Sequence, residues 1–173
     1  MKIETDLKYI EKMGEVRDEE NWAFRTFLKQ IDLGTDELDV IVHQITTEVT
    51  SQIDCTTCGN CCKQIRPVLD EDDSSEFALG LKMAAPEFEG KYLKPHEDEV
   101  SKYVFKEMPC PFLKDKRCMN YEYRPQDCRS YPHLHKDRFV SRLWGVLANY
   151  SICPIVFNVY ERLKRELWHN DGV

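Results

Sequence analysis

The sequence predicts a mainly α-helical fold with a small β-hairpin, forming a compact cysteine-rich domain with an N-terminal helical hairpin. Three observations predict this fold class. Apolar residues recur at helical spacing toward both ends of the chain, while short β-prone runs occur only between residues 103 and 121. Eight cysteines, all between residues 55 and 153, supply the third observation, because such a number indicates a fold organised by its thiols.

Length and composition narrow the class of protein. The 173 residues suit one domain, and 42% apolar with 11% aromatic residues can form a core, which excludes global disorder. Lys and Arg number 24 and Asp and Glu number 31, so the net charge is −7 and the pI is about 5.3. We therefore expect no nucleic-acid partner, because such binding depends on neutralising phosphates.

Neither end of the chain carries a visible targeting or membrane signal. Residues 1–10 contain acids where a signal peptide is basic, and the longest apolar run, Leu143–Ala148, is far shorter than the roughly 20 residues needed to span a bilayer. We expect a cytoplasmic protein that does not bind membranes. Disulfides rarely persist in the reducing cytosol, so the cysteines are interpreted first as metal or redox ligands.

Helical periodicity predicts the N-terminal part, residues 1–53, to be a helical arm. Residues 1–17 are charged and only weakly periodic, a first helix begins at Asp18 and stops before Gly34, and a second runs from about Asp36 to Ile53. Residues 54–173 are predicted to form the cysteine-cluster domain with a C-terminal helix, and we expect the two parts to make one compact unit.

The middle of the chain combines a short helix with short strands. The spacing of Asp73 and Glu76 resembles a capping box, and we expect the helix that follows to end at Pro86 and to lead into a polar connection over residues 87–101. A calcium loop at 70–73 is disfavoured, because the alternating ligands and central glycine are missing. Strands are predicted at 103–105, 112–113 and 117–121, and the last two form a hairpin.

Three further helices are predicted in the C-terminal part. Pro125 can begin a short helix that carries Cys128, residues 139–150 repeat apolar side chains at helical spacing, and the last helix begins near Pro154.

The cysteines fall into two groups that point to metal binding. The first is Cys55-x2-Cys58-x2-Cys61-Cys62, and the second comprises Cys110, Cys118, Cys128 and Cys153. Two residues between cysteines let the chain curl so that both sulfurs reach one ion. Four cysteines in eight residues are a poor packing solution, and disulfides need an oxidising compartment. We predict that all eight are metal ligands, in a compact metal-centred domain.

The spacing leaves the metal open. Eight thiolates can form two closed tetrahedral sites, which corresponds to about two zinc ions. Alternatively, Cys55, Cys58 and Cys61 match the first three cysteines of a bacterial ferredoxin run and predict a [4Fe–4S]-type cluster. Position 65 is Ile where a fourth cysteine would stand, but Cys110-Pro111 and Cys153-Pro154 each offer a remote Cys-Pro. In an extended backbone the side chains of Cys61 and Cys62 diverge, so they would serve different metals or leave one thiol idle.

Basic and imidazole side chains accompany the cysteines. Arg124 and Arg129 flank Cys128 and are candidates to offset the negative charge of bound thiolates. His133 and His135 could replace a cysteine ligand or move a proton, although eight cysteines already satisfy two sites.

Four blocks of this sequence together resemble a known family. They are Cys55–Cys62, Pro109–Leu113, Cys118–Glu122 and Arg124–Pro132. In this order they are similar to the CxxCxxCC family, the YkgJ-like cysteine-cluster proteins described as chelating zinc or iron, over roughly residues 55–153. The resemblance implies metal binding through the cysteines. One branch comprises flagellin lysine N-methylases, but this chain has no glycine-rich S-adenosylmethionine loop after a strand, so the resemblance does not carry that activity over.

The sequence therefore predicts a cytosolic metal-binding protein that holds zinc or an iron–sulfur centre. The alternative is an iron–sulfur enzyme in redox or protein-lysine methyl-transfer chemistry. A protein partner bound by the exposed helix faces is a third hypothesis, and no residue is assigned a catalytic role.

Overall fold

The computed structural model describes residues 2–168, which fold as two units. Unit 1 comprises residues 2–54 and 132–168, and unit 2 comprises Cys55–Tyr131. The described chain is mainly helical and adds two small antiparallel sheets, which confirms the predicted fold class. In this part of the chain no helix is both long enough and apolar enough to cross a membrane.

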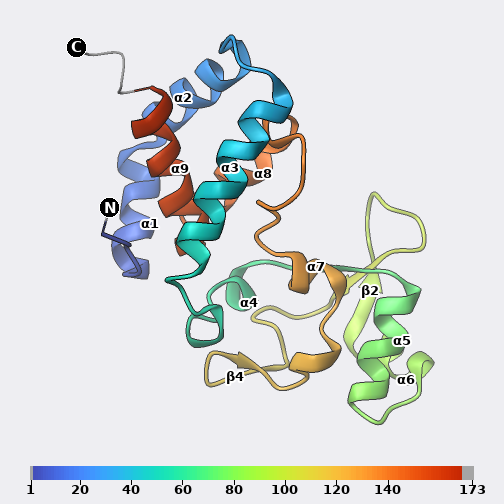
Figure 1. The fold of residues 1–173 in the computed structure, drawn as a ribbon. Helices are drawn as coiled ribbons and strands as arrows, with labels where there is room; N and C mark the ends of the chain where they lie inside the picture. The colour runs from blue at the N-terminus through green and yellow to red at the C-terminus, as the bar shows by residue number, and fades with distance from the viewer. Residues whose placement is uncertain (1, 169–173) are drawn as a thin grey trace. The chain divides into compact units, whose positions relative to one another are not determined.

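Unit 1 is a bundle of α-helices (Figure 1). Its elements are α1 (Leu7–Val16), α2 (Asp18–Gln30), α3 (Thr35–Thr50), the 3₁₀ turn η3 (Phe139–Arg142), α8 (Leu143–Tyr150) and α9 (Pro154–Leu167). Helix α9 lies between α1 and α3 and buries an apolar face that includes Val156, Val159 and Leu163. The fully buried rings of Phe24 and Tyr160 meet edge to face, 5.2 Å apart, and join α2 to α9.

Polar contacts fix the ends of these helices. The carboxylate of Asp6 accepts hydrogen bonds from the backbone N–H groups of Lys8 and Tyr9 and begins α1, a helix that the weak periodicity of residues 1–17 did not predict. The amide of Asn158 on α9 exchanges two hydrogen bonds, of 2.9 and 2.7 Å, with the backbone of Glu4. These bonds tie the N-terminal segment to the last helix.

Unit 2 is built from shorter elements around an aromatic core. They are η1 (Cys55–Thr57), α4 (Cys61–Gln64), β1 (Val68–Leu69), α5 (Glu71–Gly80), α6 (Ala85–Tyr92), β2 (Leu93–Pro95), β3 (Tyr103–Phe105), β4 (Leu113–Lys114), β5 (Arg117–Cys118), η2 (Tyr121–Tyr123) and α7 (Gln126–Ser130). One antiparallel sheet has the order β1-β3-β2, and β4 pairs with β5. The buried rings of Phe77, Phe88, Phe105 and Phe112 contact one another between the helices and strands.

The predicted hairpin is present, with a tight turn. Leu113 pairs with Cys118 and Lys114 with Arg117. The two turn residues, Asp115 and Lys116, have φ of 47° and 68°, which is the left-handed pair that a two-residue hairpin turn requires.

Two expectations for the middle of the chain were wrong. Helix α5 begins three residues earlier than predicted, because Asp70 and Asp73, rather than Asp73 and Glu76, form the capping box. Pro86 does not end this helix but lies in the first turn of α6, where its missing N–H costs no hydrogen bond. The residues expected to form a polar connection therefore begin with a helix and a strand.

Candidate metal centre

Seven of the eight predicted ligands lie in unit 2. All seven are thiols, and their exposure ranges from exposed to half-buried. They are Cys55, Cys58, Cys61, Cys62, Cys110, Cys118 and Cys128. Cys153 belongs to unit 1, where it is 5% exposed and directly precedes α9.

Four of these thiols come close enough to interact electrostatically: Cys62, Cys110, Cys118 and Cys128. Burial raises the pKa of Cys110 to about 11, and it also raises the pKa of Cys118 and of Cys128. The negative charge of Cys62 raises all three further, and Cys128 also senses Cys110 and Cys118. Since charge interactions in a partly buried site act over roughly 10 Å, the four sulfurs lie in one neighbourhood, although they are up to 66 residues apart in sequence.

Backbone contacts position the four thiols. The N–H of Cys110 donates a 2.8 Å hydrogen bond to the carbonyl of Cys62, which joins α4 to the turn before β4. Cys118 is fixed by the hairpin ladder. The carboxylate of Asp127 accepts a 3.0 Å hydrogen bond from the N–H of Val68, and this places α7, and with it Cys128, beside β1.

Backbone N–H groups point at two of the sulfurs. The N–H of Phe112 is directed at the thiol of Cys110 and the N–H of Asn120 at the thiol of Cys118, whereas the N–H of Leu113 donates a 3.0 Å hydrogen bond to the carbonyl of Cys110. The first two contacts oppose the effect of burial on the pKa. Inward-pointing amides are the usual way in which a loop stabilises negative sulfur, whether as a thiolate or as a metal ligand.

Cys61 and Cys62 contact each other. A hydrogen bond between the two side chains lowers the pKa of Cys62 to about 7, with the positive charge of Arg124 as a further cause. The expectation that adjacent thiols diverge rested on an extended backbone. Cys61 instead begins the helix α4, where neighbouring side chains are separated by about 100° rather than lying on opposite sides.

The loop with the first cysteines packs on the hairpin at a glycine. Gly59 has φ of +62°, and a Cβ built there would lie 2.6 Å from the carbonyl oxygen of Lys116 and 2.8 Å from its Cα. Only glycine permits this close approach of two backbones. The Cys58–Cys61 segment is thereby held against the hairpin that carries Cys118.

The two predicted arginines have different roles. Arg124 stacks on Tyr121, with its guanidinium carbon 3.3 Å from the ring centroid, and its charge lowers the pKa of both Cys62 and Cys118. Arg129 instead donates hydrogen bonds of 2.7 and 2.9 Å to the carbonyls of Arg124 and Glu122. Arg124 thus supplies the positive charge beside the thiols, and Arg129 fixes the loop that carries it.

The two histidines lie in unit 1, outside the segment that carries the seven cysteines. Burial, followed by the charge of Lys136, lowers the pKa of His135. The charges of His133 and His43 also lower the pKa of His135, but among the described residues no three or more His, Cys, Asp or Glu side chains stand in positions that could hold a metal ion.

The donor chemistry suits a soft metal ion, but the sulfurs do not yet converge. Thiolates with N–H donors and a neighbouring cation are the ligands that zinc and iron–sulfur centres use. Within residues 2–168, however, no three or more His, Cys, Asp or Glu side chains stand in positions that could hold an ion as they are. Binding would therefore have to draw the thiols closer together.

A small unit that brings thiols from α4, a hairpin and α7 beside an arginine defines a class of cysteine-centred metal-chelating domains. The chain belongs to the CxxCxxCC family, described as a "putative zinc- or iron-chelating domain", whose family model matches residues 54–153. This match covers more than half of the chain and supports metal binding in general. No curated protein and no solved structure shows a significant match to it.

Proposed function

We propose that unit 2 binds a metal ion through Cys62, Cys110, Cys118 and Cys128. The observation that carries this proposal is the grouping of these four thiols, with N–H groups directed at two of them and Arg124 beside two. Four half-buried thiols are a poor solution for packing alone, whereas an ion gives each sulfur a strong partner.

Zinc is the first metal that we propose. Four thiolates close a tetrahedral zinc site and leave no open position, so the ion would be structural. Unit 2 has a reason to need one, since none of its strands exceeds three residues and no helix exceeds ten. Metal binding would then contribute to the free energy of folding.

An iron–sulfur centre is the second candidate, and one observation favours it. Cys55, Cys58 and Cys61 keep ferredoxin spacing, and the contact between Cys61 and Cys62 joins this triplet to the group of four. Seven cysteines in one unit could hold a polynuclear cluster. Redox or methyl-transfer chemistry would then require a substrate site beside the cluster.

Metal analysis of the full chain tests the proposal. The protein is purified anaerobically, and zinc, iron and acid-labile sulfide are measured per chain together with the absorption spectrum. At least one zinc with no visible colour supports the structural site, and iron with matching sulfide supports the cluster. A folded protein that contains no metal and takes up neither zinc nor iron contradicts metal binding.

Serine variants identify the ligands. Cys118→Ser and Cys128→Ser should each lower the bound metal well below the native amount, because serine is a poor ligand for soft ions. Cys153→Ser tests the remaining predicted ligand: full metal content in this variant removes Cys153 from the ligand set. Metal content unchanged in all three variants would contradict the assigned group of four.

A further inference from the structure

A pocket of about 400 Å³ opens in unit 1, outside the segment that carries the metal centre. It lies between the C-terminal half of α2, the first residue of α3, the turn η3 and the start of α8. A pocket of this size falls in the range of small-molecule sites.

Positive charge dominates the walls of this pocket. Arg25 and Lys29 lie one turn apart on α2, Arg138 faces them from the start of η3, and no acidic residue lines the pocket. In the described chain none of these three side chains forms an ion pair, although the protein has a net charge of −7. Three unneutralised cations in an acidic protein indicate a site for an anion.

The side chain of Arg25 has an unused donor. Its guanidinium lies 5.2 Å from the ring centroid of Trp22, and its Nε is buried without a hydrogen-bond partner. A buried donor without a partner costs free energy, typically as much as a lost hydrogen bond. Arg25 also lines the pocket, so a small shift of its side chain would let an anion there supply the missing acceptor.

Arg138 occupies its position under backbone strain. Its φ is +61°, a conformation that costs a non-glycine residue of the order of 1 kcal/mol. The buried carboxylate of Asp39 enforces this conformation by accepting hydrogen bonds from the N–H groups of Arg138 and Phe139, at 2.5 and 2.9 Å. These bonds fix the point at which the Arg138 side chain leaves the backbone, beside the pocket that it lines.

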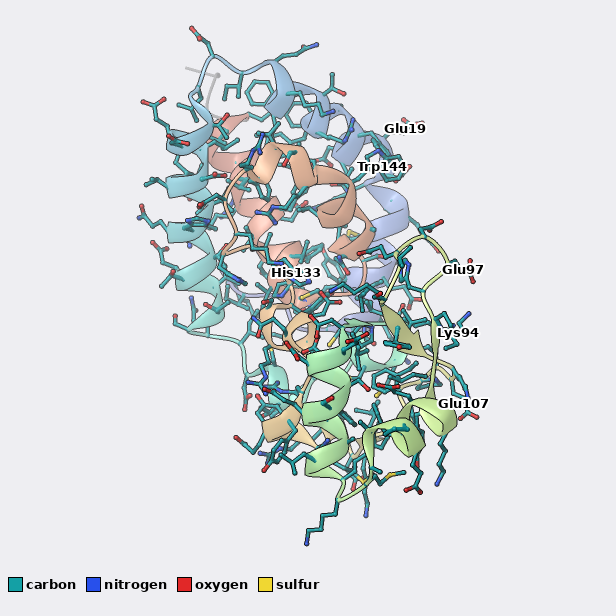
Figure 2. The ribbon with its side chains drawn as sticks, turned by 90° about the vertical axis from the view of Figure 1, so that its right-hand side faces the viewer. Glu19, Lys94, Glu97, Glu107, His133 and Trp144 are labelled. Atoms are coloured by element: carbon teal, nitrogen blue, oxygen red, sulfur yellow. The ribbon has the colours of Figure 1, made fainter. Side chains whose placement is uncertain are left out.

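The remaining walls suggest the rest of the ligand. Thr35 begins the 16-residue helix α3 and adds a hydroxyl to the wall, while the first turn of that helix already carries Asp36 and Glu37. Trp144 of α8 also lines the pocket; it is 66% exposed and packs edge to face on Trp22 of α2 (Figure 2). An exposed indole ring at the rim can stack on a flat apolar group.

The geometry points to a binding site for a small molecule that carries a phosphate group and an aromatic body. Phosphate is favoured over carboxylate because its charge of roughly −1.5 to −2 matches three cations better than a single negative charge does. The phosphate would lie among Arg25, Lys29 and Arg138, and the aromatic body would lie against Trp144. This inference does not depend on the proposed metal site.

Calorimetric titration of the full, metal-loaded chain tests the inference, with phenyl phosphate, inorganic phosphate and phenyltrimethylammonium as probes. We expect phenyl phosphate to bind more tightly than inorganic phosphate, the cation not to bind, and added salt to weaken binding. Lys29→Gln and Arg138→Gly should each weaken phenyl phosphate binding at least about tenfold. Arg138→Gly also relieves strain, so its thermal midpoint should stay equal or rise, and loss of binding cannot then be attributed to unfolding.

Arg165→Gln is the matched control, because it removes the same charge from an exposed position of α9 and should leave affinity within about twofold. Absence of saturable phenyl phosphate binding up to about 10 mM would overturn the inference. If Arg165→Gln weakens phenyl phosphate binding as much as the pocket variants do, the inference is also overturned, because the loss then follows from net charge alone. Equal affinity for phenyl and inorganic phosphate would refute the aromatic part.

Discussion

Replacing Gly59 by alanine should destabilise unit 2 selectively. A left-handed φ costs an alanine about 1–2 kcal/mol. The new Cβ would also lie 2.6, 2.8 and 3.0 Å from three backbone atoms of Lys116, and backbone cannot move aside as a flexible side chain can. Forcing an atom into such a contact typically adds about 1–3 kcal/mol. The free energy of unfolding of unit 2 should therefore fall by about 2–5 kcal/mol, a large share of a typical domain's stability.

The matched control is Gly90→Ala, in the same unit. Gly90 lies within the helix α6, and a Cβ at this position meets no atom within 4 Å. Alanine is a better helix former than glycine, so this variant should raise the free energy of unfolding by about 0.5–1 kcal/mol. The same chemical change thus has opposite predicted effects at two positions of one unit.

Hydrogen exchange read by mass spectrometry is the suitable assay, because Trp22, Trp144 and Trp168 all lie in unit 1 and fluorescence would miss unit 2. In Gly59→Ala the amides of the first cysteine loop and of the β4–β5 hairpin should exchange faster, and the thiol of Cys58 should be labelled more rapidly. Native exchange rates in this variant, or equal shifts in both glycine variants, would refute the close approach of the loop to the hairpin.

Two further predictions concern charged side chains. The N–H of Asp73, with Lys102 as a lesser cause, holds the pKa of Asp70 below its ordinary value of 3.8. The stability that this helix cap contributes is therefore complete above pH 3.8, and it is lost as the pH falls through the lower pKa of the folded state. Asp70→Ala should cost about 1 kcal/mol at pH 7, and it should make acid unfolding less steep; an unchanged acid transition would contradict this assignment. Lys164 is 1% exposed and donates a 2.8 Å hydrogen bond to Glu161, which also has Arg17 as a partner, so Lys164→Met should destabilise unit 1 by about 1–3 kcal/mol in urea unfolding followed by tryptophan fluorescence. The adjacent, exposed Arg165→Met should change stability by less than about 0.5 kcal/mol, and similar losses in both variants would argue against a special role for the buried ammonium.

Local signals in the sequence predicted several elements of the fold. Pro154 fixes the backbone angle of a first helical turn, and α9 begins there; Pro125 in the same way immediately precedes α7, which carries Cys128. The short β-prone runs on either side of Lys114–Lys116 predicted the hairpin. These predictions succeeded because a proline or a turn acts within a few residues, without help from distant parts of the chain.

Local signals failed where a contact with another segment decided the outcome. Helix α1 was not predicted although its apolar residues share one face; it depends on its cap at Asp6 and on packing of Ile10, which is fully buried. Pro86 can end one helix or begin the next, and Phe88, buried in the aromatic core, decides in favour of α6. A lysine is usually exposed, and the burial of Lys164 depends on glutamates that lie up to 144 residues away in the sequence.

The candidate metal centre shows the same division. The sequence by itself determined that this protein has a cysteine cluster suited to metal, because residue type and close spacing decide which atoms can bind soft ions. Only the tertiary structure decided that Cys62, Cys110, Cys118 and Cys128 lie in one neighbourhood and that Arg124 lies near two of them. The physical reason is that these contacts join α4, a hairpin and α7, and their pairing depends on backbone hydrogen bonds and a shared core between segments far apart in the chain.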